Sequence, residues 1–371
     1  MAEELFIGLM SGTSLDGVDG VLADFSGGRI AVRAHAVASF PVSLRAELLA
    51  LNSLGGDNEL HRAALAGNGL ARVYAEVVEQ LLADTGTAPV AVAAIGAHGQ
   101  TVRHRPGEFD DLGYTLQINN PSLLAELTGI CVVADFRSRD LAAGGQGAPL
   151  VPGFHRALFA RDEEAVAVLN IGGISNLSLL PAGSGTVLGF DCGPGNALLD
   201  HWCQSHIGQP FDTGGRWAAT GRVLPELLSR CLTDAYFTKP PPKSTGRDLF
   251  NPTWLAACLA GAEAQPADVQ ATLAELTAQV CATELQRHGK DIRLLVICGG
   301  GALNEHLMGR LRALLPAVQV LSSAELGLPP QQVEAAAFAW LARSTMRREP
   351  GNLASVTGAR GARVLGAIYP A

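Results

Sequence analysis

A short polar turn between two apolar segments near the start of the chain carries residues suited to phosphate chemistry. Ser11, Gly12, Thr13 and Ser14 offer hydroxyl groups and unhindered amides, and the Asp16 carboxylate follows them. Amides and hydroxyls can bind phosphate oxygens, and a nearby carboxylate can hold Mg²⁺ or its waters. An ordinary β-turn with an Asx hydrogen bond would explain the same residues. The chain has no G-x-x-x-x-G-K-S/T pattern, which excludes a Walker P-loop.

A carboxylate in the middle of the chain is a candidate for acid–base chemistry. Asp191 stands at the expected end of a strand, and Gly193, Pro194, Gly195 and Asn196 then open a helical run. A carboxylate at a strand end, beside a glycine turn, suits a general base that acts on a hydroxyl group or on water. The structural alternative is an N-cap aspartate for the helix that follows.

Two further glycine-rich turns resemble the first in their setting. Each follows a buried apolar segment, and the later one leads into a helix, which would bring backbone amides and a helix N-terminus beside a ligand. Close packing of a helix on a sheet would explain the glycines about as well. The residues are Gly172, Gly173, Ser175 and Asn176 in one turn, and Gly299, Gly300 and Gly301 in the other.

The segments that must hold these turns alternate between short apolar strands and longer helical patterns. Their order predicts an α/β protein with parallel or mixed sheets. The turns at Gly12 and Gly172 each join two strands and lie roughly one domain length apart, which suggests a duplication. The expected strands are residues 5–10, 18–25, 89–96, 129–134, 165–171, 177–180 and 293–298, and the main helices are 60–83, 266–288, 302–315 and 331–343.

Composition narrows the class of protein. A length of 371 residues predicts two domains. A formal net charge of −8 argues against a nucleic-acid binder, which needs a basic surface. The seven cysteines include no C-x-x-C pair, so neither a disulfide framework nor a zinc ribbon is indicated. We expect a cytoplasmic protein without a membrane segment, because the chain shows neither a signal peptide nor an apolar run of about 20 residues.

Seven longer stretches, in order along the chain, resemble the anhydro-N-acetylmuramic acid kinase family of the actin/hexokinase-like ATPases. The resemblance runs from Ile7 to about Gly366, and two positions depart from it, Asn119 and Cys192, where glycine and threonine are usual. The stretches are residues 8–19 (GLMSGTSLDGVD), 98–104 (HGQTVRH), 134–137 (ADFR), 170–176 (NIGGISN), 190–196 (FDCGPGN), 242–247 (PKSTGR) and 333–338 (VEAAAF).

The resemblance implies two duplicated actin/hexokinase-like (ribonuclease H-like) domains around a nucleotide cleft. The first would comprise residues 1–140 joined by 345–371, and the second residues 141–344. It also implies a kinase that uses ATP and Mg²⁺ to phosphorylate 1,6-anhydro-N-acetylmuramic acid at O6 while water opens the anhydro ring. Such a step belongs to peptidoglycan recycling. A homodimer is a further, family-based expectation.

Residue roles carry over position by position from the resemblance. Asp191 matches the catalytic aspartate and would activate the attacking water, and Asp16 would lie on the metal side. The nucleotide would contact Ser11, Gly12, Thr13, Ser14, Leu15, Asp16, Gly17, Val18, Gly172, Gly173, Ser175, Asn176, Gly299, Gly300 and Gly301. The sugar would contact His98, Gln100, Thr101, Arg137 and Glu334.

Structural explanations stand beside several of these roles. Arg137 would fit the lactyl carboxylate, or else a salt bridge with Asp135 or Asp140. His98 could be a satisfied histidine at a strand end, and Glu334 could lie on a solvated helix face. Residues 243–247 would form either a mobile rim over the site or a surface turn. Two rival functions remain open: a non-catalytic actin-like nucleotide switch, and a kinase for another sugar.

Overall fold

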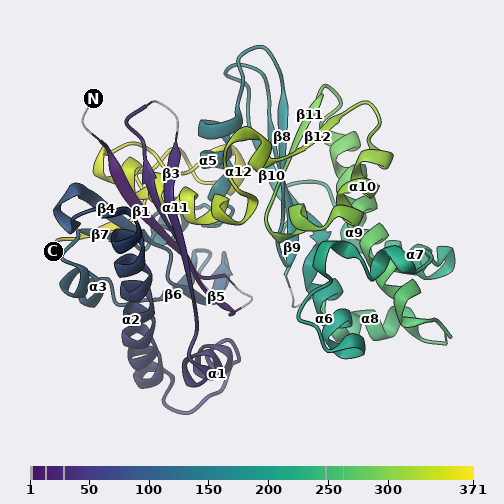
Figure 1. Cartoon of the computed structure of the whole chain (residues 1–371), viewed down its shortest axis with the longest axis horizontal. Helices are drawn as coiled ribbons and strands as arrows, with labels where there is room; N and C mark the ends of the chain where they lie inside the picture. Colours follow the sequence, from purple (N-terminus) through teal and green to yellow (C-terminus); the bar gives the residue numbers. More distant parts are fainter. Residues whose placement is uncertain (1–2, 13–14, 28–29, 247–248, 262) are drawn as a thin grey trace. The chain divides into compact units, whose positions relative to one another are not determined.

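The structure is a computed structural model that describes residues 3–12, 15–27, 30–246, 249–261 and 263–371. The chain divides into two compact units (Figure 1). Unit 1 combines residues 1–158 with residues 332–371, and unit 2 comprises residues 159–331.

Unit 1 is built on a six-stranded mixed sheet in the order β13-β7-β4-β1-β2-β3 (Figure 1). β1 runs antiparallel to β2 and parallel to β4, and β4 runs parallel to β7. A separate hairpin, β5 with β6, follows β4. The strands are β1 (Leu5–Met10), β2 (Gly17–Asp24), β3 (Ala31–Ser39), β4 (Val92–Ala97), β5 (Gln100–Pro106), β6 (Gly113–Ile118), β7 (Val132–Ala134) and β13 (Ala367–Tyr369).

Helices cover both faces of this sheet. Successive side chains of a strand point to opposite faces, so Ile7 packs in one core with Tyr74, while Phe6 packs in a second core with Phe338. The helices are α1 (Val42–Leu51), α2 (Glu59–Thr85), α3 (Pro121–Thr128), α4 (Ser138–Ala142), α5 (Val151–Phe159), α11 (Val333–Met346) and α12 (Ala354–Thr357).

The contact between α11 and the sheet depends on two glycines. A Cβ atom on Gly8 would collide with the backbone of Ala335, and one on Gly96 would collide with the backbone of Phe338. The helix backbone therefore lies directly on β1 and β4, which fixes the position of Glu334 in its first turn.

Unit 2 repeats the same sheet plan with five strands in the order β10-β9-β8-β11-β12. β8 runs antiparallel to β9 and parallel to β11, and β11 runs parallel to β12. The strands are β8 (Val166–Ile171), β9 (Ile174–Leu180), β10 (Leu188–Pro194), β11 (Leu294–Cys298) and β12 (Gln319–Ser322). The helices are α6 (Asn196–Ile207), α7 (Pro225–Leu232), α8 (Pro252–Leu259), α9 (Pro266–His288) and α10 (Glu305–Leu314).

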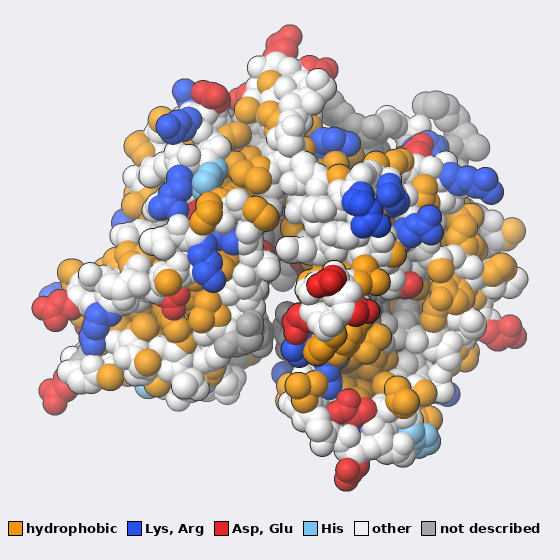
Figure 2. All heavy atoms as spheres, turned by 180° about the vertical axis from the view of Figure 1, so that it is seen from behind, with side chains coloured by type: hydrophobic (Ala, Val, Ile, Leu, Met, Phe, Trp, Pro, Cys, Tyr) orange, Lys and Arg blue, Asp and Glu red, His pale blue; other side chains and the backbone are white. Residues whose placement is uncertain are grey.

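The two sheets share one topology, in which three antiparallel strands are followed by strands parallel to the first. This confirms the expected α/β fold with duplicated actin/hexokinase-like domains. The surface in Figure 2 carries acidic, basic and hydrophobic side chains interspersed. None of the helices in the described part of the chain has the length and apolar character needed to span a membrane.

The division between the units differs from the boundaries expected at residues 140 and 344. Most of α5 and all of α11 belong to unit 1, because α11 packs on β1 and β4. Asp140 explains the other difference. Its buried carboxylate accepts hydrogen bonds from the Gly147 amide at 2.8 Å, the Asn352 amide group at 2.6 Å and the Thr357 hydroxyl at 2.8 Å. The glycine-rich segment after Asp140 is thereby tied to the C-terminal part of unit 1.

Candidate active site

The first candidate turn lies at the carboxyl end of β1. The Leu15 amide donates to the Gly12 carbonyl at 3.2 Å, and Leu15 adopts a positive φ of 58°. A left-handed backbone is unusual for leucine and is found most often where the surroundings enforce it. Leu15 and Val18 are buried, whereas Gly17 lacks room for a Cβ atom beside Ala38. Thr13 and Ser14 lie outside the described residues.

Ser11 anchors this turn through its side chain. Its hydroxyl donates to the Gly99 carbonyl at 3.0 Å and lies 3.0 Å from the Tyr74 hydroxyl, which accepts from the Gly99 amide at 3.0 Å. Because Tyr74 accepts from that amide, its own proton is available to Ser11. The Ser11 hydroxyl is therefore bonded within the protein, and only its backbone lies in the turn expected to bind phosphate.

Asp16 is the exposed carboxylate of the turn. Its side chain is 74% exposed, and the nearest cation is Arg45, 3.6 Å away. Arg45 also donates to the Leu15 carbonyl at 3.0 Å, which holds it beside the turn. The described residues contain no group of three or more metal-ligating side chains. Magnesium needs no such group, because one or two carboxylates together with substrate phosphates usually hold it.

The segment after β4 lies next to this turn. The His98 amide donates to the Leu9 carbonyl at 3.0 Å, and His98 Nδ1 lies 3.2 Å from the Ser11 carbonyl. The Gln100 amide group donates to the Gly12 carbonyl at 3.1 Å. The carboxyl ends of parallel strands are where open α/β sheets bind ligands, and here two of them, β1 and β4, bring the expected phosphate and sugar residues together.

Arg137 completes this cluster from the segment after β7. It donates to His98 Nε2 from Nε at 3.3 Å and Nη2 at 2.9 Å, and to the Gly147 carbonyl from Nη1 at 2.8 Å. The alternative role for Arg137, a salt bridge with Asp135 or Asp140, is not among the ion pairs of the described residues. Burial lowers the pKa of Arg137 to about 10, against the opposing charges of Glu334 and Asp140. Glu334 is half-buried and its charge acts on Arg137, while a solvated helix face stays the alternative interpretation.

His98 is buried and neutral. Burial lowers its pKa to about 3, and the Arg137 charge acts in the same direction. The satisfied-histidine interpretation and a role beside the sugar are both compatible with this arrangement.

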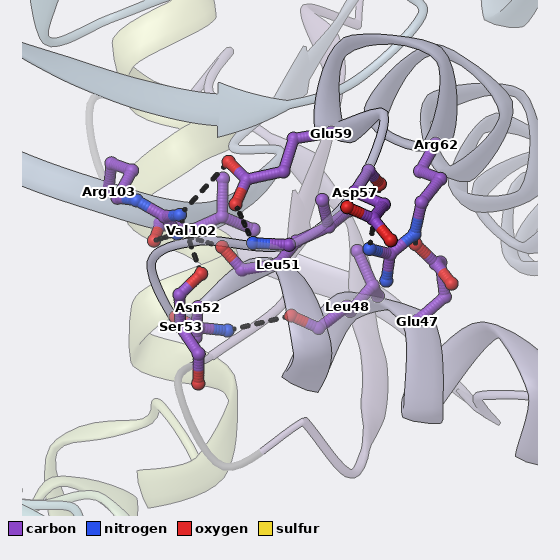
Figure 3. Close-up of polar contacts among 11 residues, drawn as sticks. Glu47, Leu48, Leu51, Asn52, Ser53, Asp57, Glu59, Arg62, Val102 and Arg103 are labelled. Carbon is purple, nitrogen blue, oxygen red and sulfur yellow. Dashed lines mark hydrogen bonds and ion pairs between the residues drawn. The ribbon is translucent and has the colours of Figure 1, made fainter.

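Thr101 lies at the start of β5, which is held by side-chain bonds from its own hairpin and from the α1–α2 region. Gln117 on β6 donates to the Thr101 hydroxyl at 3.3 Å. Two residues further on, Arg103 donates to the Leu51 and Ser53 carbonyls and pairs with Glu59 at 3.3 Å (Figure 3). These bonds join β5 to the end of α1 and the start of α2.

A cavity of about 300 Å³ opens beside His98. Of the five residues expected to contact the sugar, His98 alone lines it among the described residues. Its lining is largely polar and comprises His98, Thr115, Leu116, Gln117, Asn119, Pro121, Ala134, Asp135, Ser138 and Tyr369. Asn119, one of the two departures from the family pattern, therefore lies in the wall of this cavity.

In unit 2, the β8–β9 turn holds the start of α6. The Gly172 carbonyl accepts from the Asn196 amide at 2.8 Å, and the Gly173 carbonyl accepts from the Gly195 and Ala197 amides at 3.0 and 3.1 Å. A Cβ atom on Gly172 would have no neighbour nearer than 3.7 Å, so this glycine leaves open space. Ser175 is buried, whereas Asn176 is half-buried and pairs with Asp191 across β9 and β10.

The third candidate turn, at Gly299 to Gly301, packs against the end of β8 beside the Gly172 turn. Gly299 has a φ of 76°, and its Cβ atom would collide with the Asn170 side chain and the Ile171 backbone. Gly301 is similarly close to Ile171, so close packing explains both of these glycines. Gly300 is exposed, and the nearest atom to its Cβ position is Asn196 Nδ2 at 3.4 Å. The carboxyl ends of β8 and β11 thus bring all three candidate segments of unit 2 together.

Asp191 is held in place by three hydrogen bonds. Its Oδ2 accepts from the Thr245 amide at 3.0 Å, its own amide donates to the Lys243 carbonyl at 3.1 Å, and its carbonyl accepts from the Tyr236 hydroxyl at 2.8 Å. Burial raises the pKa of Asp191 to about 6, although the Thr245 amide and the Lys243 charge lower it. The N-cap alternative is wrong, because α6 begins at Asn196 with Gly195 at its N-cap.

The buried contacts of Lys243 were not predicted from the sequence. Its side chain is 2% exposed, so neither a surface turn nor a mobile rim describes this residue. A lysine within a short polar segment does not indicate burial. Its partner Glu284 lies on α9, far along the chain, so the sequence does not reveal the pair.

Comparison with known proteins identifies the family of this chain. A family model described as anhydro-N-acetylmuramic acid kinase matches residues 4–371. The chain belongs to the anhydro-N-acetylmuramic acid kinase family. Asp191 and the Gly12 and Gly172 turns lie in three of the stretches that resemble this family, residues 190–196, 8–19 and 170–176.

Curated relatives in the anhydro-N-acetylmuramic acid kinase family match along their whole length. The kinase of Variovorax paradoxus (strain S110) is 77% identical, with 100% of each chain covered. That of Albidiferax ferrireducens is 62% identical, covering 99% of this chain and 100% of the relative. Among solved structures, a ROK family glucokinase from Streptomyces griseus in complex with glucose and AMPPNP is 14% identical, with a TM-score of 0.42 over 92% of this chain and 99% of that one.

Proposed function

We propose that the chain transfers the γ-phosphoryl group of ATP to O6 of 1,6-anhydro-N-acetylmuramic acid, while water opens the anhydro ring. The family makes the chain a kinase, a phosphotransferase with an alcohol group as acceptor. The products would be N-acetylmuramic acid 6-phosphate and ADP. The observation that carries the chemical proposal is the Asp191 carboxylate, which is half-buried, oriented by the Thr245 amide and raised in pKa to about 6.

Asp191 acts as the general base in this proposal. A base whose pKa lies near 6 is ionised at neutral pH and still takes up a proton readily. It removes a proton from water as the water oxygen attacks the anomeric carbon. The bond from that carbon to O6 breaks, O6 forms a bond to the γ-phosphorus, and the bond from phosphorus to ADP breaks. The proton of the attacking water goes to Asp191.

The phosphate groups are assigned to backbone amides rather than to cationic side chains. In unit 1 these are the amides of the Gly12 turn, and in unit 2 those around Gly172 and Gly300, beside the open space at Gly172. The Ser11 hydroxyl is excluded from direct contact because Gly99 and Tyr74 engage it. Mg²⁺ would neutralise developing charge on the phosphates, and the exposed Asp16 carboxylate fits a site that holds one carboxylate and phosphate oxygens.

The sugar is assigned to the cluster at the carboxyl end of β4. His98, Gln100, Thr101, Arg137 and Glu334 stay the proposed contacts. Arg137 supplies the positive charge that an N-acetylmuramic acid carboxylate would need, since its guanidinium is held in place by His98 and Gly147.

The deciding experiment measures ADP release with Mg²⁺-ATP, with and without 1,6-anhydro-N-acetylmuramic acid, for wild type and Asp191→Asn. We expect a sugar-dependent rate that falls by about 100- to 10,000-fold in the variant, which is the usual contribution of a general base. The matched control is Asp291→Asn, which removes an exposed acidic residue of the same unit outside the candidate site. Glucose and N-acetylmuramic acid complete the panel.

Each rival function gives a different result in the same panel. A kinase for another sugar would respond to glucose instead of the anhydro sugar. A nucleotide switch would bind ATP and turn it over slowly whatever sugar is present. Either result in a folded protein would contradict the substrate assignment.

The cellular setting follows from the chemistry. A reaction that consumes ATP and a cell-wall sugar fits peptidoglycan recycling in the cytoplasm. The homodimer stays a prediction, which light scattering during size-exclusion chromatography would measure.

A further inference from the structure

A buried cluster of charged and aromatic side chains contacts the β10 backbone at Asp191. Lys243 Nζ lies 3.2 Å from Glu284 Oε1, and both side chains are at most 3% exposed. The same ammonium lies over the Tyr236 ring at 4.9 Å and the Phe190 ring at 5.9 Å. Ring faces attract cations, so the carboxylate and both rings hold the ammonium at one point.

This cluster connects directly to Asp191. Phe190 precedes Asp191 on β10, and Tyr236 donates its hydroxyl to the Asp191 carbonyl at 2.8 Å. The Lys243 carbonyl accepts the Asp191 amide at 3.1 Å, and two residues later the Thr245 amide reaches Asp191 Oδ2 at 3.0 Å. Fixing the Lys243 side chain therefore fixes the segment whose backbone holds the carboxylate.

We propose that Lys243 is a positioning residue for Asp191, which holds residues 243–245 against β10 and supplies a positive charge beside the half-buried carboxylate. The proposal rests on the proposed role of Asp191 as the base. Burying an ion pair costs desolvation energy that its attraction does not always recover, so stability alone is a weak reason for a lysine here. A nearby cation favours the ionised form of Asp191, which would explain why the Lys243–Glu284 pair is present.

Other titratable groups around Asp191 must be considered with Lys243. Glu284 has two further partners, Arg287 at 3.0 Å and His288 at 3.4 Å, so its charge is shared among three basic groups. Burial and hydrogen bonding to Cys281 raise the pKa of Cys192, and burial raises that of Tyr236, which keeps both neutral. Lys243 is the cation whose charge lowers the pKa of Asp191.

The test is the pH profile of sugar-dependent kcat/KM for Lys243→Met and Lys243→Arg. In Lys243→Met the acid limb should move to higher pH by about one unit, the lower end of the shift expected from a nearby charge. The rate should then fall about ten-fold at pH 5 and approach the wild-type rate at pH 9. Lys243→Arg keeps the charge and should leave the limb near its wild-type position.

Two controls separate charge from folding. Arg287→Gln removes a cation from the same Glu284 carboxylate at a half-exposed position, and it should leave the limb unmoved. Lys243→Met with Glu284→Gln leaves no unpaired buried charge, so it should fold even where the single variant does not. Its acid limb should still lie above that of wild type. A folded variant without the Lys243 charge whose limb coincides with wild type overturns the proposal.

A second readout does not need the sugar. The midpoint of the Asp191 carboxyl resonance in ¹³C NMR, assigned by its absence in Asp191→Asn, should rise by the same amount in Lys243→Met. If wild type shows no sugar-dependent ADP release but this midpoint moves, the substrate assignment fails and the action of Lys243 on Asp191 stands. An unmoved midpoint overturns the action of Lys243 whatever the substrate.

Discussion

His98 accepts hydrogen bonds at Nε2 from two nitrogens of Arg137, at 2.9 and 3.3 Å. A guanidinium can only donate, so Nε2 is unprotonated and the ring proton sits on Nδ1, 3.2 Å from the Ser11 carbonyl. One imidazole thus links the segment assigned to the sugar with the turn assigned to phosphate. Changes to Arg137 should therefore be felt at the turn as well as at the sugar.

Arg137→Lys should raise the KM for the sugar about ten-fold and lower stability, because an ammonium cannot donate to His98 and Gly147 in the same fork geometry. Steady-state kinetics and thermal melts measure the two effects. Arg139→Lys, an exposed change two residues away on α4, is the matched control and should match wild type. An Arg137→Lys enzyme with unchanged KM and melting temperature would remove Arg137 from the sugar site.

Tyr74→Phe should destabilise the turn after Ser11, although Tyr74 is not among the proposed ligand contacts. It removes the hydroxyl that accepts from the Gly99 amide and contacts Ser11, leaving buried polar groups unpaired at a cost of about 1–3 kcal/mol. The KM for ATP should rise more than the KM for the sugar. Tyr114→Phe changes an exposed tyrosine of β6 and should have no effect on either KM or the free energy of unfolding.

Asp191→Asn should stabilise the protein at pH 8 and have less effect at pH 4. The folded pKa of about 6 lies above the ordinary aspartate value of 3.8, so the folded state binds the proton more tightly than the unfolded state. The favourable contribution of this carboxyl is full below pH 3.8 and is lost as pH rises through 6. Urea unfolding of wild type and variant at the two pH values measures the difference. An equal effect at both would mean that Asp191 has an ordinary pKa.

Gly8→Ala should destabilise unit 1 strongly, by about 1–3 kcal/mol or more, because the added methyl group overlaps the Ala335 backbone. Sugar-dependent activity should fall with it, since α11 carries Glu334. Gly309→Ala on α10 is the control: its Cβ atom meets nothing within 4 Å, so it should be neutral or stabilising by up to about 1 kcal/mol. Calorimetry distinguishes the two.

The sequence predicted elements well where pattern and position are local. The long helix expected at 266–288 is α9, and the strands around Gly12 and Gly172 form as expected. It gave no strand for β3 or for the β5–β6 hairpin, whose partly exposed residues lack a continuous apolar pattern. Lys243 and Tyr74 were missed for another reason. Their roles depend on partners far away in the chain, which a single sequence does not reveal.

The course of the chain through the two units has a consequence for protein synthesis. Unit 2 is one uninterrupted run, whereas the sheet of unit 1 is covered by α11 only after residues 332–371 have been made. During synthesis, the face of β1 and β4 that carries Gly8 and Gly96 therefore lacks α11 until all of unit 2 has been translated. Nascent chains that stop short of α11 would leave this apolar face exposed, and exposed apolar surface makes incomplete chains prone to aggregate.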